Sequence, residues 1–361
     1  MAKQTVIPRY RGFNLDYMLI DFNDSRPAQR ERLAKYNIDF INSELEMIAD
    51  LGFNFVRFPI NYKNMIGNYD EFWKGEDPVL DEKHMLLFDT SVERAIELGL
   101  YVEFALHTAP GYSVLAALTS PEPHILWESE FAQDRFTVLW KKISERYKSI
   151  SAKNMSYNLV NEPPSVQRGL TPELYARIMS DAIAAIRKNK DDKIIFADGI
   201  RWGRVGVPEL CGIDGVAQSC RAYDPDCLTH CGFGRKEDLT LKWPGIEYYD
   251  PFSGRDKSEG TFWDYNLLNK EFGKWAEMAE KFNIGVHCGE GGFCSTTPYE
   301  QGIRWLRDVI EILNGYNIGF ALWGLSSIFG MVDVQRKGAQ YFEHKGHMID
   351  KQIFKIMKTG I

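Results

Sequence analysis

The chain has 361 residues, of which 44% are hydrophobic and 26% are charged, so it can bury a large core and is not a disordered chain. Its formal net charge is −7 at pH 7 and no long basic run occurs, which disfavours nucleic acid and anionic membrane surfaces as partners. The sequence has no run of about 18 apolar residues, and its start does not read as a signal sequence. We therefore expect a cytoplasmic protein, or a secreted one whose leader has been removed.

Short apolar segments alternate with longer segments of helical periodicity along the whole chain. The predicted strands are residues 10–15, 54–60, 101–107, 155–162, 193–199, 216–223, 285–290 and 319–323. The predicted helices are residues 38–51, 85–98, 131–147, 172–188, 264–282, 298–313 and 349–358, with a short or broken helix near Pro208. Gly52 and Gly99 are expected to end two of these helices, and Thr171 with Pro172 to begin another.

Eight strand and helix pairs with nearly continuous apolar strands predict a closed parallel sheet. The expected fold is therefore a (β/α)8 barrel, or TIM barrel, of the α/β class, with residues 1–361 forming one catalytic domain. An open doubly wound sheet is disfavoured, because the first predicted strand is not followed by a G-x-G-x-x-G phosphate loop. The longest irregular stretch, residues 224–260 after the sixth strand, is expected to be a functional loop.

The cysteines are expected to be reduced and mostly buried, because a chain of this size needs no disulfides. They are Cys211, Cys220, Cys227, Cys231, Cys288 and Cys294. Cys227, His230 and Cys231 look like half of a zinc site, but a second half with ligand spacing is missing. We predict neither a bound metal nor an organic cofactor.

The working residues of a barrel lie at the carboxyl ends of its strands. The residues at these ends are Arg57, His107, Asn161, Glu162, Arg221, Tyr223, Glu290 and Trp323. Glu162 ends the fourth strand, which Pro163 stops, and Glu290 ends the seventh. Two carboxylates that face each other across a barrel mouth suit glycoside hydrolysis, in which one is acid and then base while the other attacks the anomeric carbon. His287 is set aside, because strand alternation puts it on the opposite face from Glu290.

Six segments at or near the predicted strands form a combined motif: NFVRFP at 54–59, LHTAPG at 106–111, LVNEP at 159–163, RAY at 221–223, GEG at 289–291 and ALWG at 321–324. These segments resemble those of glycoside hydrolase family 5, the cellulase and mannanase family of retaining (β/α)8 enzymes. They follow the family order and span almost the whole chain.

The resemblance implies roles for the strand-end residues. Glu162 would be the general acid/base, and we expect burial and the charge of its partner to raise its pKa so that it is protonated when substrate arrives. Glu290 would be the nucleophile and must stay ionised, with Arg57 orienting it by charge and hydrogen bonding. Asn161 would contact the sugar 2-hydroxyl. The other implied contacts are Tyr223 with the nucleophile or ring oxygen, His107 with sugar hydroxyls, and Trp323 as the stacking floor for the sugar at the cleaved position.

One position departs from the family pattern. The family usually has a histidine two residues before the strand-six tyrosine, where this chain has Arg221. Arginine is permanently charged and forked, so it could grip a pair of sugar hydroxyls or a carboxylate but cannot be a neutral acceptor. Arg221 and the closing part of the chain resemble the subfamily that includes β-mannosidases acting on short oligosaccharides. The closing residues in question are Asp333, Tyr341, Phe342, Glu343 and residues 346–350.

We therefore predict a retaining β-glycoside hydrolase that cleaves β-linked mannosyl or glucosyl oligosaccharides by double displacement. The alternatives are an endo-β-1,4-glucanase or mannanase acting on polymer, and, from another class, an inactive carbohydrate-binding barrel. A metal-dependent barrel hydrolase is disfavoured, because His107 is the only histidine at a strand end. The loop after strand six could block one end of the cleft and favour exo cleavage. Five loop tryptophans are candidates for either packing or sugar contact: Trp73, Trp127, Trp202, Trp243 and Trp263.

Overall fold

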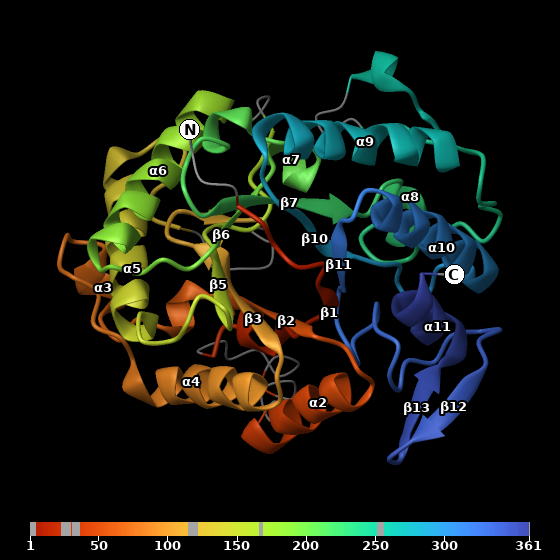
Figure 1. Cartoon of the computed structure of the whole chain (residues 1–361), viewed down its shortest axis with the longest axis horizontal. Helices are drawn as coiled ribbons and strands as arrows, with labels where there is room; N and C mark the ends of the chain where they lie inside the picture. The colour runs from red at the N-terminus through yellow and green to blue at the C-terminus, as the bar shows by residue number, and fades with distance from the viewer. Residues whose placement is uncertain are drawn as a thin grey trace.

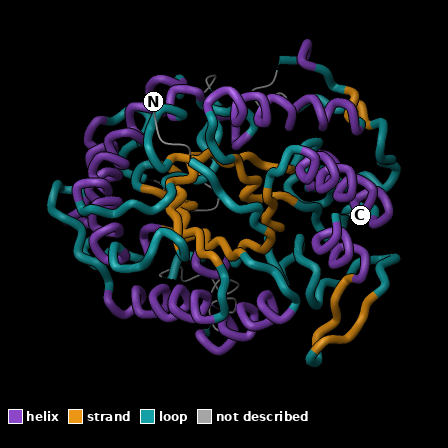
Figure 2. Tube along the Cα trace, viewed as in Figure 1, coloured by secondary structure: helices purple, strands orange, loops and turns teal. Residues whose placement is uncertain are grey.

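In the computed structural model, which describes residues 5–22, 30, 37–114, 122–165, 169–250 and 256–360, parallel strands close into a ring surrounded by helices (Figures 1 and 2). The strand order is β2-β1-β11-β10-β7-β6-β5-β3, and β3 pairs back with β2. The ring consists of β1 (Arg11–Asn14), β2 (Phe55–Asn61), β3 (Tyr101–Ala109), β5 (Met155–Asn158), β6 (Ile195–Asp198), β7 (Val216–Ala222), β10 (Val286–Gly291) and β11 (Gly319–Leu322). The predicted (β/α)8 barrel is confirmed.

Helices cover the outside of the ring (Figure 2). The longer ones are α2 (Ile38–Asp50), α4 (Glu82–Glu97), α5 (Glu130–Tyr147), α6 (Pro172–Lys188), α9 (Tyr265–Phe282), α10 (Tyr299–Gly315) and α11 (Lys351–Thr359), and the short ones are α3 (Tyr69–Phe72), α7 (Ile200–Gly203) and α8 (Asp226–Thr229). Thr171 begins α6 as predicted, since its side chain accepts a hydrogen bond from the Leu174 amide and Pro172 follows it. No helix in the described part of the chain is long and apolar enough to span a membrane.

The fourth ring strand is shorter than the sequence pattern predicts. β5 ends at Asn158, and residues 159–162 continue toward the barrel mouth outside the strand ladder. Glu162 has a φ of 47°, a left-handed backbone conformation that is unusual for a residue other than glycine. The hydrophobic pattern of the sequence could not reveal where β5 ends, because the residues before and after Asn158 are both apolar.

A short strand, β4 (Tyr112–Ser113), that pairs antiparallel with the end of β3 was not predicted, and neither were two hairpins outside the ring sheet. The hairpins are β8 (Ile246–Glu247) with β9 (Phe262–Trp263), and β12 (Tyr341–His344) with β13 (His347–Asp350). The first begins within the predicted irregular loop, which therefore has some regular structure. The second lies outside the ring beside α11, so the last helix begins at Lys351 and not at residue 349 (Figure 1).

The inside of the ring is filled in two layers. The layer nearer the amino ends of the strands is aromatic: the rings of Tyr10 and Phe55 are 5.1 Å apart, and those of Phe55 and His287 4.8 Å apart. The layer above it is polar, because the register of the first three ring strands sets Asn14, Arg57 and Glu103 side by side. The polar layer forms the base of the barrel mouth.

His287 lies on the same face of β10 as Glu290, so the prediction of opposite faces was wrong. In the ladder with β7, His287 pairs with Ser219 and Glu290 with Arg221, which leaves Gly289 as an extra residue of the β-bulge type. The small residue is needed, because a Cβ at Gly289 would lie 2.7 Å from the Ser219 hydroxyl and 2.9 Å from the Arg221 guanidinium. His287 still belongs to the aromatic layer, where burial lowers its pKa to about 3 and keeps it neutral.

Two buried tryptophans on outer helices hold segments at the barrel mouth. Trp140 on α5 donates its indole N–H to the Leu159 carbonyl at 3.0 Å, and Trp305 on α10 donates to the Asp224 carbonyl at 2.9 Å. A buried indole N–H needs an acceptor, so packing of the helix also fixes the strand end.

Candidate active site

Arg57 stands at the centre of the polar layer and is fully buried. A guanidinium has five N–H groups, and here each of them has a side-chain acceptor. Nε donates to Glu103 at 2.7 Å, Nη1 to Asn14 at 2.9 Å and Glu290 at 2.6 Å, and Nη2 to Asn158 at 2.8 Å and Asn161 at 2.9 Å. A buried charge is tolerated only when it is paired and hydrogen-bonded, so this network fixes the guanidinium in one orientation.

Glu290, at the end of β10, is only 2% exposed and is surrounded by donors. Its Oε1 accepts from Arg57 and lies 3.4 Å from Nη2 of Arg221, while Oε2 accepts from the Tyr223 hydroxyl at 3.2 Å. Nδ1 of His107 lies 4.0 Å from Oε1. These groups compensate the negative charge of the carboxylate and leave it little freedom to rotate.

Glu162 is held through its backbone. Its N–H donates to Asp198 Oδ2 at 2.8 Å, and its carbonyl accepts from the Tyr112 hydroxyl at 2.6 Å. A left-handed backbone at a residue other than glycine costs about 1–3 kcal/mol and persists only where the surroundings over-determine it. Hydrogen bonds on both sides of the strained residue supply that constraint.

The carboxyl group of Glu162 differs from that of Glu290 in its surroundings. Burial, and next the negative charge of Glu290, raise the pKa of Glu162 to about 8. Arg221 and Arg204 oppose this shift. Glu162 is therefore mostly protonated near neutral pH, as a proton donor needs to be.

Arg221 lies beneath both glutamates and is 4% exposed. Its Nε is 3.6 Å from Glu162 Oε1 and its Nη2 is 3.4 Å from Glu290 Oε1, so one cation touches both carboxyl groups. Its Nη atoms donate to Ser219, the Cys220 carbonyl, Asn161 and Asp198. Gly203 makes room for the side chain, because a Cβ there would lie 2.4 Å from Arg221 Cγ.

Three further predicted residues line the space beside Glu290. Asn161 Oδ1 is occupied by both arginines, which leaves its Nδ2 as a donor, 3.4 Å from His107 Nε2. Burial and the two arginines hold the pKa of His107 well below its usual value, so the ring is neutral, and its Nδ1 has no hydrogen-bond partner among the described residues. The Trp323 ring is partly exposed and lies 5.4 Å from the His107 ring. A neutral polar edge next to an aromatic face suits a sugar.

The structure adds residues that sequence reasoning missed. Asn14, Glu103, Asn158 and Asp198 are buried polar residues of the ring strands that hold Arg57 or Arg221, and Tyr112 holds the Glu162 carbonyl. The sequence did contain a sign of Glu103 and Asp198, because a carboxylate inside an apolar strand such as β3 or β6 needs a buried hydrogen-bond or ion-pair partner. The identity of that partner depends on which strands are neighbours.

Of the five loop tryptophans, three are buried: Trp127, Trp243 and Trp263. Trp243 donates to Asp308 at 2.8 Å and Trp263 to the Tyr248 carbonyl at 3.2 Å, so these two pack the connection between β7 and α9. Trp73 and Trp202 keep some exposed surface and remain candidates for sugar contact.

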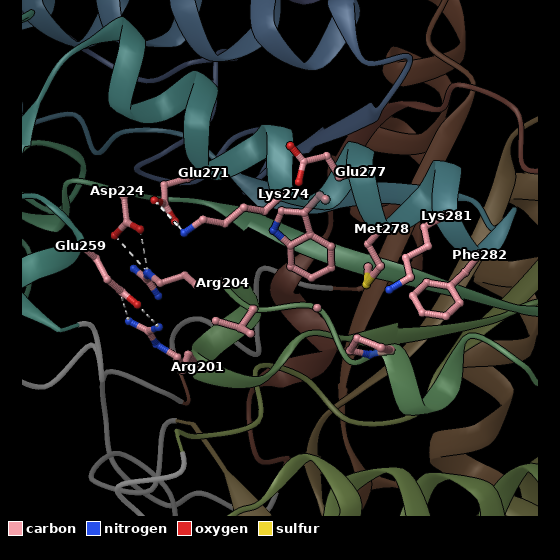
Figure 3. A pocket seen from close by; sticks show the side chains of 14 residues that line it. Arg201, Arg204, Asp224, Glu259, Glu271, Lys274, Glu277, Met278, Lys281 and Phe282 are labelled. Atoms are coloured by element: carbon pink, nitrogen blue, oxygen red, sulfur yellow. Dashed lines mark hydrogen bonds and ion pairs between the residues drawn. The ribbon is translucent and has the colours of Figure 1, made fainter.

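A cavity of about 420 Å³ lies between residues 201–208 and α9 (Figure 3). Trp275 and Met278 form part of its apolar wall. Six of its charged residues form ion pairs: Arg201 with Glu259 at 3.1 Å, Arg204 with Asp224 at 2.9 Å, and Lys274 with Glu271 at 3.1 Å (Figure 3). Glu162 and Glu290 do not line it, so the carboxylate cluster, and not this cavity, marks the chemistry.

The cysteines form no metal centre in the described part of the chain, where no group of three or more His, Cys, Asp or Glu side chains is arranged to hold an ion. All six are free thiols, and all but Cys227 are buried. Cys231 accepts the Asp238 amide at 3.2 Å, and the His230 ring lies against Tyr223 at 5.1 Å.

A (β/α)8 barrel with glutamates at the ends of the fourth and seventh ring strands has the architecture of a glycoside hydrolase. Residues 36–327 match the family model Cellulase (glycosyl hydrolase family 5). The chain belongs to glycosyl hydrolase family 5 and is a retaining glycoside hydrolase.

Individual relatives agree with this family. The chain is 25% identical to Endoglucanase C of Acetivibrio thermocellus over 334 residues, which cover 86% of this chain and 92% of the relative. It is 26% identical to Cellodextrinase A of Ruminococcus flavefaciens over 296 residues, or 80% and 78% of the two chains. A crystal structure of a glycoside hydrolase superposes with a TM-score of 0.82 at 28% identity, covering 98% of this chain and 99% of the other.

Proposed function

We propose that this chain hydrolyses short β-linked mannosyl or glucosyl oligosaccharides, with Glu162 as the general acid/base and Glu290 as the nucleophile. The observation that carries this assignment is the contrast between two adjacent carboxyl groups. Glu290 accepts hydrogen bonds from Arg57 and Tyr223. Among the described residues, the cation nearest the Glu162 carboxyl group is the more distant Arg221 Nε at 3.6 Å, and the pKa of Glu162 is raised to about 8. A difference of this kind between the surroundings of two carboxyl groups supports Glu162 as the acid and Glu290 as the nucleophile.

The reaction would proceed in two displacements. Glu290 attacks the anomeric carbon while Glu162 gives its proton to the departing glycosidic oxygen, which leaves a glycosyl ester on Glu290 and an ionised Glu162. Water then attacks the anomeric carbon from the side of Glu162, which takes a proton from it and is restored. Glu290 leaves as the carboxylate, and the product keeps the β configuration.

Sugar contacts are proposed for the groups beside the nucleophile. Asn161 Nδ2 is placed to donate to the 2-hydroxyl, the neutral His107 to bond another hydroxyl, and Trp323 to stack under the ring. For Arg221, the only N–H group without a hydrogen bond among the described residues is Nε, which faces Glu162. A direct contact between Arg221 and sugar stays a prediction.

The proposal of short substrates is supported by Arg221, which stands where the family usually has histidine, and by the similarity to a relative named Cellodextrinase A. The second candidate is an endo-acting glucanase on polymer, which the similarity to Endoglucanase C favours. Both candidates use the same pair of glutamates and differ in the length of chain that the cleft accepts.

A substrate panel separates the two candidates. With β-1,4-linked manno- and gluco-oligosaccharides from disaccharide to hexasaccharide, we expect kcat/KM at least about tenfold above that on soluble glucan or mannan, a difference of about 1.4 kcal/mol. Products are followed by chromatography, and polymer cleavage by viscosity. Glu290→Gln is the blank for contaminating activity. A viscosity that falls before small products accumulate would establish endo cleavage of polymer instead.

The pH dependence tests the assignment of the acid. kcat/KM should fall as the pH rises through about 8, because Glu162 loses the proton that the leaving group needs. The measurement uses an aryl β-glycoside whose phenol is a poor leaving group. A dinitrophenyl glycoside is the control, since its leaving group needs no proton and its alkaline decline should be absent. The same decline with both substrates would contradict the role of Glu162.

A further inference from the structure

Asp198 is the last residue of β6, and its carboxylate is fully buried in the polar layer of the barrel. Oδ1 accepts from Asn158 Nδ2 at 2.9 Å, and Oδ2 accepts from the Glu162 amide at 2.8 Å and from Arg221 Nη2. Its own carbonyl accepts from the Tyr175 hydroxyl at 2.9 Å. The residue is closed off by protein groups, so it acts through its neighbours and not on the substrate.

The link from Asp198 to Glu162 runs through the backbone. The β5 ladder ends at Asn158, so the amide of Glu162 has no strand partner and bonds to Asp198 instead. Because Glu162 has a φ of 47°, the direction of its side chain depends on what holds this amide in place.

Two separate links run from Asp198 to Glu290. In the first, Asp198 pairs with Arg221, whose Nη2 is 3.4 Å from Glu290 Oε1. In the second, Asp198 orients Asn158, which accepts from Arg57 at 2.8 Å, and Arg57 donates to Glu290 at 2.6 Å. One carboxylate is thus joined to both reacting groups.

We propose that Asp198 is a positioning residue that holds Glu162 and Glu290 in register with each other and compensates the charge of Arg221 between them. The inference rests on the roles proposed above for the two glutamates. No strand-end motif singles out Asp198, because its partners come from β5, β7 and the segment after β5.

The charge of Asp198 also bears on Glu162. The charged or titratable groups that act on Asp198 and Glu162 are Arg57, Arg204, Arg221, Glu103, Tyr175, Tyr223 and Glu290. Without Asp198, less negative charge would compensate Arg221, whose Nε lies 3.6 Å from Glu162. The negative charge of Asp198, which itself favours the protonated form of Glu162, would also be lost. Both changes lower the pKa of Glu162, so the alkaline decline of kcat/KM moves to lower pH.

The test compares Asp198→Asn with Asp191→Asn. Asp191 is a matched control: it is also buried and bonds a cation, Lys193 Nζ at 3.1 Å, and a tyrosine, Tyr157 at 2.8 Å, but it precedes β6 at the opposite end of the strand. We expect Asp198→Asn to lose roughly 100-fold in kcat/KM, the size expected when reacting groups are misplaced by about 1 Å, and to show the shifted alkaline decline. Asp191→Asn should lower Tm but keep the pH profile.

A double variant guards against failure of Asp198→Asn to fold. Asp198→Asn with Arg221→Met removes both members of the buried pair, a change that leaves no unpaired charge and is better tolerated than removing one. We expect the double variant to fold, and its kcat/KM should decline at a higher pH than that of Asp198→Asn. If Asp198→Asn cannot be measured, the decline in the double variant is expected near pH 8.

The outcomes that overturn the inference are distinct from those that overturn the proposed function. A folded Asp198→Asn protein with kcat/KM within about threefold of wild type and an unmoved alkaline decline would rule out the positioning role; threefold is about 0.65 kcal/mol. The same shift of the decline in Asp191→Asn would make the effect merely structural. Full activity in Glu162→Gln or Glu290→Gln would instead remove the roles on which the inference rests.

Discussion

Replacing Glu290 by glutamine should lower kcat/KM on an aryl β-glycoside by roughly 10⁴-fold or more, the size typical of losing a covalent nucleophile. An amide cannot form the glycosyl ester, and it cannot match the negative charge that Arg57 and Tyr223 are arranged to hold. The loss corresponds to about 5 kcal/mol of transition-state stabilisation. The rate is measured on purified protein whose far-UV circular dichroism matches wild type, which separates lost chemistry from lost structure.

A smaller side chain at the same position gives a control with a chemical signature. In Glu290→Ala, sodium azide can enter the vacated space and attack the anomeric carbon directly, with one inversion. The product should be the α-glycosyl azide, which is identified by NMR. Recovery of a β-glycosyl azide, or near wild-type activity in Glu290→Gln, would show that Glu290 is not the nucleophile.

Replacing Glu162 by glutamine should cost about 10²–10⁴-fold in kcat/KM on oligosaccharides, the usual contribution of general acid–base catalysis. The loss should be much smaller for dinitrophenyl glycosides, because their leaving group needs no proton. With such a substrate the glycosyl ester should accumulate, since no base then activates water, and a burst of phenol should precede a slow steady state. The alkaline decline near pH 8 should disappear with the group that causes it.

Azide distinguishes this residue from Glu290 as well. In Glu162→Ala we expect the glycosyl ester still to form on Glu290, so azide should attack after a first inversion and the product should be the β-glycosyl azide. An α product here, together with a β product from Glu290→Ala, would exchange the two assignments.

The charge balance of the polar layer explains why a proton is retained at this site. Two buried arginines, Arg57 and Arg221, lie among four carboxyl groups: those of Glu103, Asp198 and Glu290 are buried, and that of Glu162 is partly buried. Two guanidinium charges cannot neutralise four carboxylates in a low-dielectric interior. Burial raises the pKa of Glu103 to about 7 and that of Glu162 to about 8, so these two groups are the ones that keep protons most readily.

An arginine beneath the glutamates also demands its own compensation. Arg221 brings a permanent charge to a position where the family usually has histidine, and Asp198 provides the opposite charge beside it. The pair Gly203 and Gly289 makes room for the longer side chain. Arg221, the carboxylate that compensates its charge and the glycines that make room for it therefore form one group of residues in contact.

Much of the fold and part of the site could be predicted from local patterns. Alternating apolar segments indicated eight strand and helix pairs, Thr171 and Pro172 marked the start of α6, and the residues before each break pointed to Glu162 and Glu290. These predictions succeed because propensity, capping and the position of a strand end are properties of neighbouring residues in the chain.

Other features depended on pairing between distant segments. The extra residue at Gly289 turned His287 to the inner face, and β5 ended at Asn158 although its apolar pattern continues. A bulge is set by the register with the adjacent strand, so alternation counted along one strand cannot locate it.

By itself, the sequence determined a barrel with two glutamates at its strand ends, because hydrophobic periodicity and strand termination depend on residues that are neighbours in the chain. Only the tertiary structure decided that Asp198 holds the amide of Glu162, that Arg221 lies under both glutamates, and that Glu162 keeps its proton to a pH of about 8. Hydrogen-bond partners and pKa values depend on burial and on charges within a few ångströms. Closure of the ring brings the charged side chains of six strands together in one interior that excludes water.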